Sequence, residues 1–74
     1  MAVASISEIK ASSTESFDDA LKQGVARAVK TLRNVRSAWV QNQDVQIDEN
    51  GNIVEYRVQL KVTFVLDDYR AGNL

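Results

Sequence analysis

Residues Glu55–Leu66 read EYRVQLKVTFVL, and the other predicted elements are arranged around this run. Every second position carries an apolar side chain, in the series Tyr56, Val58, Leu60, Val62, Phe64 and Leu66. A strict period of two over a dozen residues is typical of a β-strand with one buried face. The run is longer than the usual strand of about five or six residues and contains no proline. We therefore predict that it is the central strand of a sheet, with a neighbour on each edge.

An amphipathic helix precedes this strand. Apolar and small side chains fall at the spacing of one helical face, in the series Phe17, Ala20, Leu21, Gly24, Val25, Ala28 and Leu32. Either Ser13 or Ser16 is the expected N-cap, and Asp18 and Asp19 place negative charge at the positive end of the helix dipole. Gly24 costs roughly 0.5 to 1 kcal/mol of helix propensity relative to alanine. Its place in the apolar stripe predicts a close approach of the helix to the sheet.

Two further strands complete the predicted domain. Val3–Ala11 is the first strand, and the polar cluster after it ends that strand and leads into the helix. Arg36–Ile47 is the next strand, and the Asn-Gly turn within Asp48–Asn52 joins it to the central strand as a hairpin, with positive φ expected at both turn residues. The polar tail from Asp67 is expected to fray. The order β-α-β-β predicts an α+β domain, with a three-stranded antiparallel sheet of order 2-3-1 and the helix over one face.

The hairpin register predicts which side chains face away from the helix. The pairs set opposite each other are Ile47 with Ile53, Gln43 with Arg57, Val40 with Leu60, and Ala38 with Val62. The outward face is then expected to carry Ser37, Trp39, Gln41, Gln43, Val45 and Ile47 on one strand, and Ile53, Glu55, Arg57, Gln59, Lys61, Thr63 and Val65 on the next.

Trp39 and the aliphatic residues of this face are more apolar surface than a small monomer leaves in water, so a partner subunit is expected there. Trp39 is either an interface aromatic or a platform on which a ligand stacks. Arg57 is either a residue of a solvated or interface ion pair or a ligand contact.

Composition narrows the function. The 74 residues make one domain, 1–74, with an expected ordered core of about 3–67, and a domain this small is marginally stable unless something supplements its core. No cysteine or histidine is present, which excludes disulfides and thiolate or imidazole metal sites. Self-association or oxygen-ligated cations remain as the means of stabilising the small core.

The charge of the chain bears on its partners. The pI of about 5.2 argues against nucleic acid as a partner. Neither a membrane span nor a secretory signal is recognisable, so a cytoplasmic protein is expected.

Catalytic patterns are missing as well. Histidine, the commonest general base near neutral pH, is absent, and the sequence has neither a Gly-x-Ser-x-Gly elbow nor a glycine-rich phosphate loop. An enzyme would have to work through carboxylates or lysine in a shared pocket, so a non-enzymatic protein is expected. Asp48 and Glu49, with Asn50 and Gly51, offer oxygen ligands for a hard cation, but their spacing is not that of a calcium loop.

Several motifs in this order resemble the dodecins, small proteins that assemble as hollow dodecamers and hold flavins in pairs between subunits. The resemblance runs from Ile6 to Leu66 and rests on ISEIKASS at 6–13, GVARAVKTL at 24–32, the hairpin, and YRVQLKVTF at 56–64. It implies a three-stranded antiparallel sheet wrapped on a helix and a homododecameric shell. It also implies a flavin that stacks on a tryptophan of the second strand and is hydrogen-bonded by a glutamine of the central strand.

Two positions depart from that pattern. Ser37 stands where the resemblance places the stacking tryptophan, and Arg57 stands where it places the glutamine, while Trp39 lies two residues further along. These departures resemble the calcium-associated dodecins. Loss of a stacking aromatic removes roughly 0.5 to 1.5 kcal/mol per ring face, so flavin binding is expected to be weakened.

The resulting hypothesis is an assembly that binds or buffers a small molecule, with FMN or riboflavin as the family default. The expected ligand-binding residues are Ser37, Trp39, Gln43, Arg57 and Gln59. The alternative is a structural or ion-holding shell that does not bind flavin, in which calcium or another hard cation is held and Trp39 and Arg57 serve subunit contacts.

Overall fold

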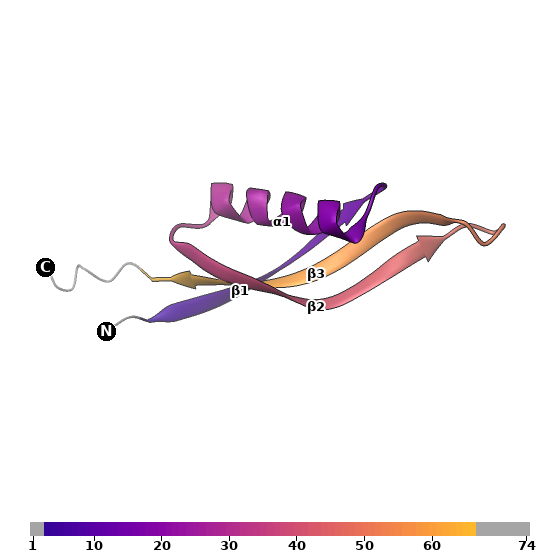
Figure 1. The fold of residues 1–74 in the computed structure, drawn as a ribbon. Helices are drawn as coiled ribbons and strands as arrows, with labels where there is room; N and C mark the ends of the chain where they lie inside the picture. Colours follow the sequence, from indigo (N-terminus) through magenta and orange to yellow (C-terminus); the bar gives the residue numbers. More distant parts are fainter. Residues whose placement is uncertain (1–2, 67–74) are drawn as a thin grey trace, which may run out of the picture.

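The structure is a computed structural model that describes residues 3–66 of the chain. Its elements follow the predicted order, with β1 (Ala4–Ser13), α1 (Phe17–Thr31), β2 (Val35–Ile47) and β3 (Ile53–Val65). The sheet has the order β1-β3-β2, and both outer strands run antiparallel to β3 (Figure 1). The predicted α+β fold, its 2-3-1 strand order and its central strand are confirmed. The predicted fraying of the tail from Asp67 lies outside the described residues.

The end of β1 differs from the prediction. The serine cluster was expected to end the strand at Ala11, but the antiparallel ladder continues through Ser12, opposite Arg57, to Ser13, opposite Tyr56. The register between β1 and β3 is regular along its whole length. Because β3 extends far enough to offer hydrogen-bonding partners here, pairing outweighs the weak strand preference of serine.

Both candidate serines take part in the start of α1. Ser16 is the N-cap: its backbone is extended, and its side chain accepts a hydrogen bond from the backbone N–H of Asp19 at 2.9 Å. Ser13 is the last residue of β1 and is buried. Its Oγ accepts a hydrogen bond from the backbone N–H of Glu15 at 2.9 Å, and its hydroxyl group donates one to Oδ2 of Asp19 at 2.6 Å. These contacts link the end of β1 to the first turn of the helix.

The core lies where α1 covers the sheet. The predicted stripe is confirmed: Ala20, Gly24 and Ala28 are its buried members on the helix, and they pack against the side of β3 that carries Leu60 and Val62. A Cβ added at Gly24 would lie 2.8 Å from Cδ1 of Leu60, which confirms the predicted close approach. Within residues 3–66, no helix is long and apolar enough to cross a membrane.

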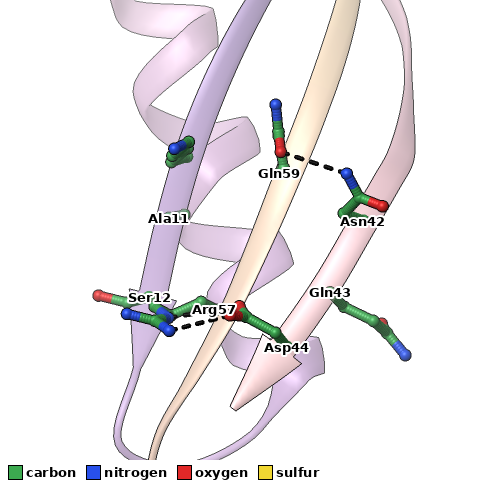
Figure 2. Close-up of a pocket in the computed structure, with 8 residues that line it drawn as sticks. Ala11, Ser12, Asn42, Gln43, Asp44, Arg57 and Gln59 are labelled. Carbon is green, nitrogen blue, oxygen red and sulfur yellow. Dashed lines mark hydrogen bonds and ion pairs between the residues drawn. The ribbon is translucent and has the colours of Figure 1, made fainter. Parts of the chain in front are cut away.

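The helix leaves much of the hairpin uncovered. It lies along β1 and β3, with β2 to one side, and the β2–β3 hairpin extends past the start of α1 (Figures 1 and 2). Val40 shows the effect, because it pairs with the fully buried Leu60 and is itself exposed. Near the hairpin tip, Ile47 and Ile53 are also exposed.

The hairpin turn is built around Asp48. Oδ1 of Asp48 accepts the backbone N–H groups of Asn50 and Asn52, each at 2.9 Å, and the backbone N–H of Gly51 bonds to the carbonyl of Asp48 at 3.0 Å. Gly51 has φ of +85°, as predicted, but the expected positive φ at Asn50 is wrong. The side chain of Asp48 organises a loop longer than the two-residue turn in which both central residues are left-handed.

Candidate ligand site on the outward sheet face

The register of β2 against β3 is the feature that positions the candidate site. The predicted pairs Ala38–Val62, Val40–Leu60 and Ile47–Ile53 are confirmed. Between the last two, however, β2 contains one extra residue, because Val40 lies opposite Leu60 and Asn42 lies opposite Gln59. Gln41 is thus a β-bulge, which shifts the residues after it by one position relative to β3. A compensating irregularity between Gln46 and Ile47 restores the predicted register at the hairpin tip.

This shift exchanges the faces of the residues that follow the bulge. The predicted pair Gln43–Arg57 is wrong: Gln43 lies opposite Val58, and Asp44 lies opposite Arg57. Val45, expected on the outward face, lies opposite Tyr56, which is on the helix side. Because directly opposed residues of an antiparallel pair share a face, the bulge brings an acid, rather than an amide, beside Arg57.

Polar side chains from all three strands form two adjacent rows on the outward face. One row is Ser12, Arg57 and Asp44, and the next is Lys10, Gln59 and Asn42. These six residues, together with Ala11 and Gln43, line an open cavity of about 630 Å³, which we call the polar cavity (Figure 2). Trp39 lies one row further along the same face, opposite Lys61.

The strongest contact in the polar cavity is the ion pair between Arg57 and Asp44. Nε of Arg57 donates to Oδ1 of Asp44 at 3.3 Å, and Nη2 donates to Oδ2 at 2.9 Å, so the pair is bidentate. The hydrogen bonds to Asp44, followed by its charge, raise the pKa of Arg57. The side chains of Arg57 and Asp44 remain 44% and 63% exposed, so water screens the pair and its net stabilisation is small.

The expected ligand-binding residues are only partly brought together. Arg57 and Gln59 line the polar cavity from β3, and Nδ2 of Asn42 donates a long hydrogen bond of 3.4 Å to Oε1 of Gln59. Gln43 reaches the rim from the opposite face of β2 and points away from the ion pair in Figure 2. Ser37 and Trp39 do not line the cavity, although Trp39 is 46% exposed. Their roles in binding stay predictions.

Lys10, Ser12, Asn42 and Asp44 were not expected from the sequence. For the two β2 residues, the need for a bulge becomes visible only once the faces of Val40 and Val45 are known. Val40 and Val45 both lie on the helix side, opposite Leu60 and Tyr56, and they are separated by five positions. Uninterrupted alternation puts residues an odd number apart on opposite faces, so this spacing requires an extra residue between the two valines.

Asp48, one of the two turn acids, is engaged within its own loop. The backbone hydrogen bond from Asn52 is the main cause that lowers the pKa of Asp48, and it outweighs the opposing effect of desolvation. The backbone hydrogen bond from Asn50 adds a smaller lowering effect. One carboxylate oxygen of Asp48 is therefore already bound to two N–H groups. Across residues 3–66, no group of three or more acidic, cysteine or histidine side chains is placed to hold a metal ion.

Comparisons with known proteins agree with this fold. The family model described as Dodecin matches residues 3–67. The calcium dodecin of Mycobacterium tuberculosis is 34% identical over 64 residues, which cover 86% of this chain and 89% of that protein.

Two crystal structures extend the likeness. A point mutant of the Thermus thermophilus dodecin matches with a TM-score of 0.82 at 34% identity, covering 90% of this chain and 98% of that one. The Mycobacterium tuberculosis calcium dodecin, described as calcium-chelating with a novel calcium-binding site, matches with a TM-score of 0.75 at 32% identity, covering 88% of this chain and 91% of that one.

Proposed function

This chain belongs to the dodecin family, and from that premise we propose that it is a non-enzymatic, self-assembling protein that binds or buffers a small ligand on the outward face of its sheet. One observation carries the proposal. The polar cavity and the exposed ring of Trp39 lie in neighbouring rows of one sheet face, which offers polar groups and a stacking surface together.

Self-assembly is supported by the two unlike sides of the sheet. The helix covers the inner side along β1 and β3, whereas Ile6 and Trp39 on the outward side are 55% and 46% exposed. Large apolar side chains that share one exposed face favour contact with another protein surface. Further copies of the same chain are the proposed partners, in a homododecamer as the family implies.

Flavin is the first ligand class to test. Trp39 supplies an aromatic face, and the amides of Gln59 and Asn42 lie one row away, within reach of the polar edge of a flat ring. Binding is expected to be weak, because Ser37 supplies no ring and Arg57 is held by Asp44.

A titration with riboflavin, FMN and lumichrome tests this ligand. The fluorescence of each flavin should be quenched at micromolar protein, because stacking on indole brings the ring into contact with an electron-rich partner. Trp39→Phe keeps an aromatic ring and should retain part of the quenching. Trp39→Ala should abolish it while the oligomer mass is unchanged.

Other outcomes are equally decisive. Absence of quenching by the wild-type protein at micromolar concentration would rule out flavin as the ligand. Dissociation of the oligomer by Trp39→Ala would instead assign the ring to a subunit contact.

A calcium-holding shell is the second candidate, favoured by the 34% identity to the Mycobacterium tuberculosis calcium dodecin. Asp44 is the one acid that lines the polar cavity, and it is engaged with Arg57. No group of three or more acids within residues 3–66 is placed to hold a metal ion, so a calcium site would need acids from more than one subunit. Equilibrium dialysis against calcium distinguishes the candidates, since the shell hypothesis expects calcium retention without flavin quenching.

A further inference from the structure

The polar cavity carries a charge opposite in sign to that of the whole chain. Its charged lining residues are Lys10, Arg57 and Asp44, which sum to +1, whereas the chain has a formal charge of −1. Asp44 already neutralises one of the two cations through its bidentate contact. Glu55, two positions from Arg57 on the same face of β3, also acts on the guanidinium by its charge. Attraction of an anion therefore rests on the hydrogen-bond donors of Arg57 and Lys10 rather than on the net charge of the face.

Hydrogen-bond donors remain available around the ion pair. The guanidinium has five N–H groups, and the contact with Asp44 engages only Nε and Nη2, which leaves Nη1 for another acceptor. Lys10 is exposed on the neighbouring strand and, within the described residues, forms no ion pair. Its row adjoins that of Arg57, and side chains this long reach a common group from diagonal positions.

Asp44 is itself an oxyanion bound to this site. A carboxylate or phosphate group offers the same pair of oxygens to a guanidinium fork as Asp44 does. Because the side chain of Asp44 is 63% exposed, it can turn into water when another anion replaces it.

We propose that the polar cavity binds an oxyanion. In the free protein the carboxylate of Asp44 occupies Arg57, and it competes with the anionic group of the ligand for this side chain. The phosphate or carboxylate group of a ligand takes the place of Asp44 on Arg57 and is also bound by Lys10. This inference rests on the proposed ligand-binding function and specifies the charge of the ligand.

FMN and riboflavin form a suitable pair of probes, because they differ by one phosphate group. Wild-type protein should bind FMN about fivefold more tightly than riboflavin, the size of one exposed charge contact. Asp44→Asn removes the competing charge and should raise the affinity for FMN about fivefold while leaving riboflavin unchanged. Lys10→Gln should bring FMN close to the riboflavin value. The preference for FMN should also decrease as salt is added.

Asp18→Asn and Lys22→Gln are the matched controls. Asp18 and Lys22 form an exposed pair at 3.3 Å on α1, away from the outward face, and the substitutions change the net charge by the same amounts. Neither should alter the ratio of FMN to riboflavin affinity. An equal change for Asp18→Asn and Asp44→Asn, or an equal effect of Asp44→Asn on both flavins, would overturn the proposal.

Inorganic pyrophosphate tests the oxyanion site without any flavin. Titration followed by ³¹P line broadening should give stronger binding for Asp44→Asn than for wild type, and weaker binding for Lys10→Gln. If this order holds while no flavin is quenched, the proposed flavin function fails and the oxyanion site stands. If flavins bind without a preference for FMN and pyrophosphate does not bind, the oxyanion site fails alone.

Discussion

A single hydroxyl group, that of Ser13, joins the end of β1 to the start of α1. Its oxygen accepts the backbone N–H of Glu15 and donates to Asp19, and the side chain is buried. Ser13→Ala leaves these groups without their partner, which costs about 1 to 3 kcal/mol of the free energy of unfolding. Urea denaturation measures this loss. Ser12→Ala, at an exposed position one residue earlier, is the control and should change stability far less.

The same contact makes stability depend on pH. The hydrogen bond from Ser13, followed by that from Gln23, lowers the pKa of Asp19 in the folded protein. A carboxyl group with a depressed folded pKa contributes stability above its unfolded pKa of about 4, and this contribution is lost as the pH falls through the folded pKa. Between pH 5 and 3, Ser13→Ala should therefore lose less stability than wild type. A parallel pH profile for the two proteins would show that this contact does not set the pKa.

At the scale of the elements, α1 lies closest to the sheet around Gly24, where no Cβ intervenes. Gly24→Ala gains about 1 kcal/mol of helix propensity, but its new Cβ would lie 2.8 Å from Leu60 and 3.2 Å from Ala11. Leu60 is fully buried, and the Cβ of Ala11 is fixed to the backbone of β1, so neither can move aside easily. The strain therefore exceeds the gain in helix propensity, and we expect the free energy of unfolding to fall by roughly 1 to 3 kcal/mol. Thermal unfolding measures it. The exposed Ala26→Gly is the opposite exchange on the same helix and should lose only about 1 kcal/mol through propensity. A stabilised Gly24→Ala would contradict the close contact.

The elements also show why the sequence predicts the fold better than the site. Apolar side chains recur at a clear helical period in α1 and at a clear period of two in β3, so both elements and their order follow from pattern alone. In β2 the run Gln41–Gln43 is polar at every position, so no apolar side chain marks the face to which each residue points. The bulge lies within this run, and it decides that Asp44 faces Arg57. Arg57 could therefore be singled out from sequence, but its partner could not.

For the whole molecule, the decisive property is that the described chain encloses little apolar surface of its own. Its buried apolar residues are Ala20, Ala28, Val58, Leu60 and Val62, of which two are alanines. A small core of this kind rarely stabilises a domain by more than about 3 to 5 kcal/mol. Association that covers the outward face would supplement it, and it would also enclose the polar cavity and increase the strength of charge contacts there.

Assembly is tested by mass and by one pair of substitutions. Light scattering should give a species close to twelve times the 8.2 kDa chain mass, and dilution should not release folded protomers. Ile6→Lys places a charge on the outward face, where Ile6 lies opposite Thr63, and it should shift the mass towards smaller species because a charge would be buried at the contact. Val29→Lys is the control, since Val29 is equally exposed but lies on α1. A folded lone protomer of the wild-type chain, or equal masses for the two variants, would show that the outward face is not the surface through which copies of this chain associate.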